Sequence, residues 1–460
     1  MSASFQQHAS SYRDPSGFVF EKDKIYYRQV NKIFKEHFNL FISSGCYEKL
    51  VKQQLLISHE QVNENLTGSD EWHTTLKPEQ IEFISYPWEW SFDMLKDAAL
   101  LTLRIAREAI SSGMILKDAT PYNIQWHKGR LIFIDTLSFE KYNPDEPWIA
   151  YRQFCEGFLS PLLLMHYSKQ SLQQLSLAWP EGIPLAATKS LLPWKTKLSL
   201  HIYLHIHLHA SVSQRKNAAD SPKAKFSKQK LLNLISSLEI LIRKLKLQGR
   251  STAWSEYYDE ASQRKNYLEQ KKSIITRWLN ELPEVKTASD LGANEGEFSL
   301  LLSAKGIKTI AVDFDSFCIN KLYNAIKTSG EKNIQPVVAD LSNPSPAVGF
   351  NNNERYSLTS RLTTDLSLAL ALVHHLAIGK NISFEMMAFF LKNISGTLII
   401  EFVPKTDEKV QLMLRNKKDI YKDYTKDIFE TIFSRYYRLE RKETIGESGR
   451  TLYLMKRNEG

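Results

Sequence analysis

The chain has very few cysteines. Only Cys46, Cys155 and Cys318 occur among its 460 residues, and they lie far apart with no C-x-x-C pair. Disulfide frameworks and cysteine-ligated zinc sites both need clustered cysteines, so neither is indicated. A reducing, cytoplasmic location fits this composition best.

Long apolar runs are also missing. No stretch approaches the roughly 20 apolar residues that a membrane helix needs. The opening residues, MSASFQQHASSYRDPSG, lack the apolar core of a signal peptide. The sequence therefore predicts neither a spanning segment nor secretion, and we expect no membrane partner.

The rest of the composition is that of a globular protein with a local excess of positive charge. Apolar residues make up 43% and charged residues 24%, enough for buried cores. The net charge is +9, and residues 211–280 hold 15 Lys or Arg against 6 Asp or Glu, an excess that equals it. We interpret 211–228 as an exposed tether and 229–280 as helices leading into a second domain. A nucleic-acid contact through this basic segment is the alternative to a solvated face.

Strand and helix patterns alternate from about residue 285 onward. Apolar strands are expected in VKTASDL, KTIAVDFD, IQPVVAD, TTDLSLALALVHHL and SGTLIIEFV, and a final hairpin in the last 25 residues. Alternation of this kind predicts a parallel, doubly wound α/β sheet whose ligand lies at the carboxyl ends of the strands.

The first strand runs into the turn Asp290-Leu-Gly292-Ala-Asn294-Glu-Gly296. Glycines permit a tight turn and a close backbone approach, while a helix N-terminus offers unpaired N–H groups. The spacing differs from G-x-G-x-x-G, which disfavours a dinucleotide. The turn resembles motif I of class I S-adenosylmethionine-dependent methyltransferases, and this resemblance implies that the acidic residue and the glycines hold the methionine and ribose portions.

Two further acidic residues follow at successive strand ends. Asp313 ends the second strand, where a carboxylate can accept both ribose hydroxyl hydrogens. Asp340 ends the third, where the methyltransferase family commonly reads the adenine amino group. The alternative is that Asp313 and Asp340 cap helices in another Rossmann-like fold.

The expected acceptor side lies at the end of the fourth strand. His374 and His375 stand there, and a neutral histidine could take the acceptor's proton. The alternative is that one packs under the cofactor and the other caps a helix. Glu401, at the end of the fifth strand, is a further candidate. Aromatic and basic residues just upstream of the first strand could form a lid, or simply pack: Trp254, Tyr257, Tyr258, Tyr267, Lys271 and Lys272.

Residues 98–140 carry a second pattern. A helix leads to Lys117-Asp118, then to Asn123 and to a strand pair ending in Asp135. This pattern resembles the catalytic loop and the metal-binding Asp of protein kinases and of aminoglycoside and lipopolysaccharide kinases. The resemblance implies that Asp118 positions an acceptor hydroxyl while Asn123 and Asp135 hold magnesium.

The departures from the kinase pattern concern the phosphate-binding parts. Leu116 stands two positions before Asp118, where the kinase pattern has a histidine. No glycine-rich phosphate loop exists, and only Lys24 or Arg28 could stand for the phosphate-binding lysine. An Arg is not a like-for-like replacement for that Lys. A turn capped by Asp118 and Asn123 is the alternative, and a domain that binds substrate without turnover is a third.

Four histidines lie close together before the basic segment. His201, His205 and His209 share one face of a helix, whereas His205, His207 and His209 would share one face of a strand. Either set could ligate a metal. No carboxylate or cysteine stands near in sequence to complete the site, so packing histidines are favoured and no metal is expected.

Taken as a whole, the chain resembles a bacterial type of class I methyltransferase with a long N-terminal extension, a group that includes proteins related to rhizobial nodulation. The phrases YPWEWSF, LKDATPYNIQ, FIDTLSFE, YRQFCEGFL, DLGANEG, LALALVHHL and EFVPK carry the resemblance.

It implies a Rossmann-like seven-stranded methyltransferase domain over 281–460, a basic linker with helices over 211–280 and an α+β, kinase-like domain over 1–210. The expected activity is methyl transfer from S-adenosylmethionine to a small molecule or glycan. The alternatives are a phosphotransferase and a non-catalytic cofactor-binding scaffold.

Overall fold

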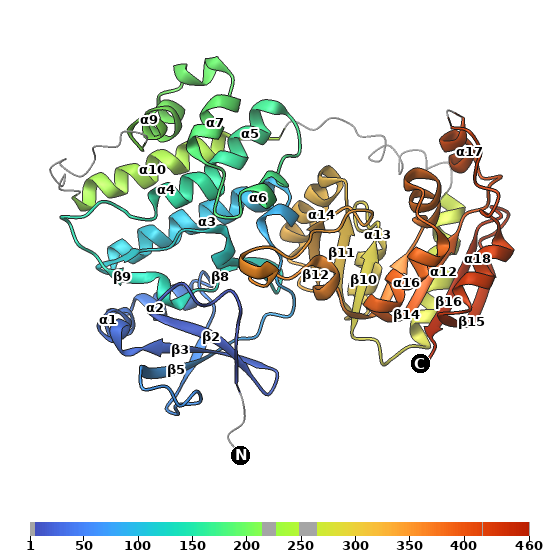
Figure 1. Ribbon diagram of the computed structural model, residues 1–460, viewed down its shortest axis with the longest axis horizontal. Helices are drawn as coiled ribbons and strands as arrows, with labels where there is room; N and C mark the ends of the chain where they lie inside the picture. The colour runs from blue at the N-terminus through green and yellow to red at the C-terminus, as the bar shows by residue number, and fades with distance from the viewer. Residues whose placement is uncertain (1–4, 214–226, 248–264, 416, 460) are drawn as a thin grey trace. The chain divides into compact units, whose positions relative to one another are not determined.

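The computed structural model describes residues 5–213, 227–247, 265–415 and 417–459 (Figure 1). The chain divides into two compact units, one made of residues 1–249 with 347–356 and the other of 250–346 with 357–460. The basic segment 211–280 is therefore shared between the units. Helix α10 (Lys228–Lys244) belongs to the first unit and helix α12 (Lys265–Asn280) to the second.

The first unit begins with a five-stranded antiparallel sheet in the order β1-β2-β3-β5-β4. Strands β2 and β3 pair from Gly17 opposite Val30 to Lys22 opposite Ile25. Two short hairpin-like pairs, β6 with β9 and β7 with β8, follow farther along the chain. The bounds are β1 Gln6–Gln7, β2 Gly17–Lys22, β3 Ile25–Asn31, β4 His59–Val62, β5 Trp72–Pro78, β6 Met114–Leu116, β7 Ile124–His127, β8 Arg130–Phe133 and β9 Phe139–Lys141.

Helices make up most of the remainder of this unit. The longest, α3, is amphipathic, and α10 lies against it, with Arg107 of α3 bonded to Glu239 at 3.1 Å. The region WIAYRQFCEGFLSPLLLMHY forms α4, a π-helical turn (Cys155–Leu159) and α5 in direct succession. The bounds are α1 Lys35–Ser43, α2 Cys46–Lys52, α3 Phe92–Ser111, α4 Tyr151–Phe154, α5 Ser160–Ser168, α6 Leu175–Ala178, α7 Leu185–Leu191, α8 Leu200–Ile202 and α9 His209–Ser213.

Residues 347–356 complete the first unit from far along the chain. Glu354 is almost fully buried and accepts hydrogen bonds from the Tyr12 hydroxyl at 2.7 Å and from Arg13 at 2.8 Å. The Arg355 guanidinium lies 3.8 Å from the centre of the Tyr122 ring. A buried carboxylate needs such charged partners, so this segment is held by specific bonds rather than by apolar contact alone.

The second unit is built on a seven-stranded sheet in the order β12-β11-β10-β13-β14-β16-β15. The first five strands in this order are parallel. β16 runs antiparallel to them, and β15, which pairs antiparallel with β16, runs in their direction again. The sheet is therefore mixed, with the parallel part and the closing hairpin that the sequence predicts. The bounds are β10 Thr287–Leu291, β11 Lys308–Asp313, β12 Ile334–Val338, β13 Thr364–Ala369, β14 Ser395–Phe402, β15 Tyr437–Thr444 and β16 Thr451–Arg457.

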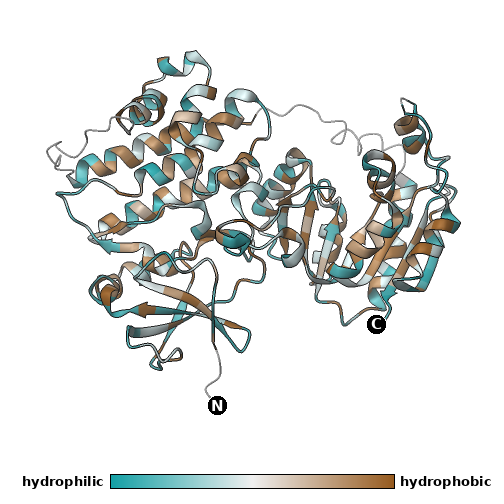
Figure 2. Ribbon diagram, in the orientation of Figure 1, coloured by the Kyte–Doolittle hydropathy of each residue, from teal (hydrophilic) through white to brown (hydrophobic). Residues whose placement is uncertain are grey.

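Helices connect these strands, because parallel neighbours need crossover connections. The strands carry brown, apolar stretches in Figure 2, as expected for a sheet covered on its faces. The bounds are α13 Glu297–Ala304, α14 Ser316–Ser329, α15 Leu358–Arg361, α16 Phe384–Ile394, α17 Glu408–Leu414 and α18 Lys426–Phe433.

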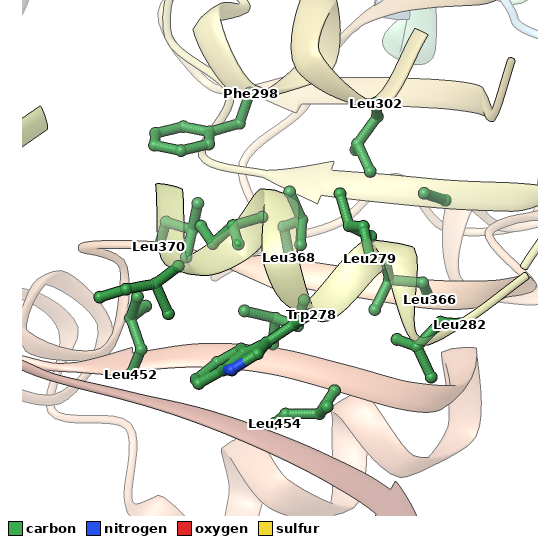
Figure 3. Packing of buried hydrophobic residues seen from close by; sticks show 14 of the residues in the cluster. Trp278, Leu279, Leu282, Phe298, Leu302, Leu366, Leu368, Leu370, Leu452 and Leu454 are labelled. Carbon is green, nitrogen blue, oxygen red and sulfur yellow. The ribbon is translucent and has the colours of Figure 1, made fainter. Parts of the chain in front are cut away.

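Helix α12 supplies a large part of the core of this unit. Trp278 and Leu279 pack with Leu366 and Leu368 of β13 and with Leu454 of β16, as Figure 3 shows. Within residues 5–213, 227–247, 265–415 and 417–459, no helix is long and apolar enough to cross a membrane. The three cysteines are buried and free.

Replacing Trp278 with Ala should lower the free energy of unfolding of the second unit by about 3–5 kcal/mol, because a large buried side chain leaves a cavity. Urea unfolding of the full chain, followed by circular dichroism, measures this. Leu300→Ala, on the partly exposed face of α13, is the control and should cost under about 1 kcal/mol. Equal losses in both variants would contradict the placement of α12 in the core.

Candidate functional site

A cavity lies at the carboxyl ends of the parallel strands in the second unit. The strand order reverses between β10 and β13, and open α/β sheets bind ligands at such a point. Residues at or just beyond the carboxyl ends of β10, β11, β12 and β13 line the cavity together with α12. The lining is Tyr267, Leu268, Lys271, Asp290, Gly292, Ala293, Asn294, Phe298, Val312, Asp313, Phe314, Ala339, Asp340, Leu341, Leu370, Ala371, Leu372, His375, Leu376 and Lys380.

The glycine turn after β10 forms one wall. Gly292, Asn294 and Gly296 all have φ in the left-handed region, at 81°, 50° and 86°. A Cβ on Gly296 would lie 2.5 Å from the Leu322 side chain, so both backbone conformation and packing require glycine there. Gly292 and Asn294 line the cavity, whereas Gly296 shapes the turn and the start of α13 from behind.

Asp313 is oriented toward the cavity by the backbone around it. Its carboxylate accepts the N–H groups of Asn294 and Asp315, each at 2.8 Å. Asp290 lies deeper and accepts the Ser299 hydroxyl at 2.7 Å. Burial raises the pKa of both carboxyls to about 6, and their mutual repulsion adds to the effect on Asp290.

Asp340 occupies a more open position. It lies two residues beyond the end of β12, and its carboxylate accepts the Ser342 hydroxyl and lies 3.4 Å from the Lys380 ammonium. Burial alone would raise its pKa, but the Ser342 hydrogen bonds and the Lys380 charge outweigh burial and lower it. The structure thus brings Asp290, Asp313 and Asp340 to one cavity, as the sequence predicts.

The two histidines differ in their relation to the cavity. The sequence placed them at the end of a strand, but β13 already ends at Ala369, and they begin a π-helical turn (His375–Gly379). His375 lines the cavity, whereas His374 does not and is fully buried. Burial lowers the pKa of His375 to about 4, and nearby Arg450 adds to the decrease. The ring of His375 is therefore neutral near pH 7.

Glu401, near the end of β14, is the centre of a buried charged cluster rather than part of the cavity lining. It is completely buried and accepts the Lys271 ammonium at 2.5 Å and the Ala371 N–H at 2.9 Å. Arg450 lies 3.4 Å away and binds Asp407 through two nitrogens at 2.8 and 3.1 Å. Although burial raises it, the pKa of Glu401 is lowered overall by Lys271 and Arg450.

The upstream helix contributes directly to the cavity. Tyr267 and Lys271 of α12 line it, and both are held by Glu401, with the Tyr267 hydroxyl donating at 2.5 Å. Lys272 points elsewhere and pairs with Glu297. The other lid candidates, Trp254, Tyr257 and Tyr258, lie outside the described residues.

Sequence reasoning missed several lining residues that carry no motif. Phe314 follows Asp313 directly and is half exposed. An aromatic residue directly after the strand-end carboxylate is the sequence signal that could have identified it as a lining residue. Lys380 comes from the loop after the histidines, and only its contact with Asp340 reveals it.

The kinase-like residues also come together, in the first unit. Asp118 follows β6, and its pKa is raised by burial and by the nearby charge of Asp135. Asn123 donates to the Ser138 hydroxyl at 3.2 Å, and Ser138 in turn donates to Asp135. Arg28 of β3 forms an ion pair with Asp135. Both carboxylate oxygens of Asp135 are thus bonded to protein groups, whereas Asn123 is bonded through its nitrogen, and the kinase-like function stays a prediction.

The histidine cluster is helical and is engaged in packing. His201 and His205 both bond the Ser237 hydroxyl of α10 at 2.8 Å, and His205 also bonds Tyr151 at 2.7 Å. His207 bonds Thr196 at 2.9 Å, and His209 stacks on the Tyr151 ring. Among the described residues no group of three or more His, Cys, Asp or Glu is arranged to hold a metal.

Glu401→Gln should lower the free energy of unfolding by about 3–5 kcal/mol, because it leaves Lys271 and Arg450 buried without their full counter-charge. Urea unfolding of the full chain measures this. Glu281→Gln, which removes an exposed carboxylate paired with Arg441, is the control and should cost about 0–1 kcal/mol. A cost near the control's would show that Glu401 is not the centre of the cluster.

Comparisons with known proteins place the whole chain in a family. No family model matches it. Among solved structures, the N-methyltransferase NodS from Bradyrhizobium japonicum WM9 is 12% identical and covers 42% of this chain and 97% of its own, with a TM-score of 0.31. Magnesium protoporphyrin IX methyltransferase from Synechocystis PCC 6803, solved with bound SAH, is 14% identical and covers 46% of this chain and 90% of its own, with a TM-score of 0.32. Nodulation protein NoeA from Rhizobium meliloti (strain 1021) is 32% identical over 462 residues, which cover 98% of this chain and 96% of that protein. The chain belongs to the NoeA family of nodulation proteins.

Proposed function

We propose that this protein is an S-adenosylmethionine-dependent methyltransferase whose cofactor binds in the cavity of the second unit. The observation that carries the proposal is the convergence of three strand ends on one cavity. A glycine turn after β10, Asp313 at the end of β11 and Asp340 beyond β12 all line it. Each supplies a group suited to a different part of the cofactor.

The lining fits the chemistry of this cofactor. The turn at Gly292 lets the backbone approach a ligand closely, as the methionine and ribose portions require. Asp313, fixed by two N–H groups, would accept the ribose hydroxyls. Asp340 would accept from the adenine amino group beside the apolar surfaces of Phe314 and Leu341.

When bound, S-adenosylmethionine supplies an electrophilic methyl group for in-line displacement by the acceptor. The protein's part is to align the acceptor, exclude water and receive a proton. His375 lines the cavity with a neutral ring, which can accept a proton. His374, fully buried behind it, would act by packing, and we assign the acceptor-side role to His375.

The acceptor is proposed to be a small molecule or glycan, as the sequence resemblance implies, and membership of a family of nodulation proteins is consistent with this. Extract incubated with the protein and tritium-labelled S-adenosylmethionine identifies it. Label in glycan or small molecules supports the proposed acceptor. Label in RNA or protein instead would show that the acceptor belongs to that class. Binding without label in any fraction would favour a cofactor-binding scaffold.

Asp313→Asn should weaken S-adenosylmethionine binding about 10- to 100-fold, because a charged hydrogen-bond acceptor is lost. In the wild type the dissociation constant should be flat above about pH 7 and rise as the pH falls through 6. The reason is that the pKa of the Asp313 carboxyl is raised to about 6, and its protonated form no longer accepts both hydroxyls. Titration calorimetry between pH 5 and 8 measures both effects.

The control for this titration is Glu440→Gln, on exposed β15. It should bind as the wild type does at every pH. In Asp313→Asn the dissociation constant should change less with pH, and the change that remains should come from titration of Asp290. No binding by the wild type, or equal binding by Asp313→Asn, would refute the proposed cofactor site.

The phosphotransferase alternative has less support, because Arg28 neutralises the Asp135 carboxylate that would ligate magnesium. We therefore expect no magnesium-dependent ATP binding, as measured by calorimetry with and without EDTA. Binding that needs magnesium and is lost in Asp135→Ala would favour phosphotransfer instead. The matched variant Asp93→Ala, on the first turn of α3, should have no effect.

A further inference from the structure

The helical segment between residues 191 and 212 of the first unit exposes an unusual number of large apolar side chains. Eight of the 22 such side chains in the described part of the chain fall in this short stretch. Trp194 and Leu198 are about three-quarters exposed, at 74% and 76%. We call this set the apolar face: Leu191, Trp194, Leu198, Leu200, Tyr203, Leu204, Leu208 and Val212.

The apolar face is held in place by the fold beneath it. The opposite side of the same helix buries Ile202, Ile206 and Ala210, and His205 bonds Ser237 of α10. The Trp194–Leu198 turn is tied to this helix by the Thr196–His207 bond at 2.9 Å. Helix α7 is tied to it by Lys189, which donates to Ser211 at 2.9 Å. The apolar side chains are thus presented outward by an ordered support.

Along the sequence, the segment that carries the apolar face has charge of one sign, and Glu156, which packs against Leu185 of α7, is paired with Arg152. No Asp or Glu occurs from residue 182 to residue 219, a run of 38 residues. Within the run stand Lys189, Lys195, Lys197, Arg215 and Lys216. Exposed Lys195 and Lys197 stand beside exposed Trp194 and Leu198, and only Thr196 of this turn is buried, so positive charge and apolar surface share one turn of chain.

We propose that the apolar face docks on an anionic lipid surface. Exposed apolar patches of this kind mark interaction sites, and Trp and Leu flanked by Lys suit the boundary between lipid headgroups and acyl chains. Lysines there gain from the negative surface potential of anionic lipid. The attachment is peripheral, since no described helix could cross a membrane. It replaces the expectation, drawn from the lack of a spanning segment, that the chain has no membrane partner.

Charge and polarity argue against the two other occupants. A second copy of this chain would bring two lysine-rich surfaces of the same sign together around a two-fold axis, which like-charge repulsion opposes. Nucleic acid would be bound through its phosphates by the lysines, but exposed Leu191, Leu200 and Leu208 offer it neither hydrogen bonds nor charge. The proposal is independent of the methyltransferase assignment.

The test is co-sedimentation of the purified full chain with vesicles of phosphatidylcholine alone and of phosphatidylcholine mixed with phosphatidylglycerol. The wild type should bind the anionic vesicles, and added salt should weaken binding. Trp194→Ser with Leu198→Ser should reduce the partition coefficient about tenfold or more, since two apolar anchors are lost. Lys195→Gln with Lys197→Gln should reduce binding to anionic vesicles only.

The matched control is Lys32→Gln with Ile33→Ser, which removes one exposed lysine and one exposed apolar side chain elsewhere in the first unit. It should bind vesicles as the wild type does, and circular dichroism checks that every variant is folded. Absence of vesicle binding, or equal losses in the control, would overturn the proposal. So would a wild-type dimer in analytical ultracentrifugation that Trp194→Ser with Leu198→Ser makes monomeric, or binding to labelled RNA that the same variant loses.

Discussion

The second unit depends on one buried carboxylate. Glu401 lies on β14, yet its bonds extend to α12 through Lys271 and Tyr267, to the residue after β13 through Ala371, and to the start of β16 through Arg450. Ala371 has φ of 49°, a conformation that non-glycine residues rarely adopt, and its N–H is bonded to Glu401. Four elements therefore meet at one acceptor with no exposure to solvent, and two of them, α12 and the segment after β13, line the cavity.

Two carboxylates that line the cavity differ from Glu401 in having no cation in direct contact. Asp290 and Asp313 are buried without a cation in direct contact, so their pKa values rise toward neutrality, whereas Lys271 and Arg450 keep the pKa of Glu401 low. Burying charge without a counter-charge costs stability, and proteins accept such costs mainly where function needs the group. The contrast separates a carboxylate that joins several elements of the structure from carboxylates that line the cavity without a counter-charge in direct contact.

Much of the sheet and part of the site were predictable from sequence, for local reasons. The glycine turn and the strand-end residues Asp313 and Asp340 could be placed because the carboxyl ends of parallel strands meet at one edge. The role of Glu401 could not be predicted, because its partners lie 30 to 134 residues away and no spacing rule joins Lys271 to it. The same holds for Arg28, which pairs with Asp135 across 107 residues. This pairing occupies a carboxylate that the local kinase-like pattern assigns to magnesium.

The positions of His374 and His375 could not be predicted from the sequence for a different reason. The apolar run TTDLSLALALVHHL has no internal signal for where its strand ends, and β13 stops at Ala369. Ala371, in the turn that follows, is bonded to Glu401 of another strand, and His375 rather than His374 lines the cavity.

The ten residues 347–356 have a consequence for how this protein can be divided. They are contributed to the first unit by a stretch of chain that otherwise builds the second. A polypeptide that stops at residue 249 lacks them and leaves Arg13 and Tyr12 without Glu354. One that starts at residue 250 keeps them but separates Glu354 and Arg355 from their partners. No single cut at this boundary yields two intact halves, because either piece loses the bonds that join residues 347–356 to the first unit.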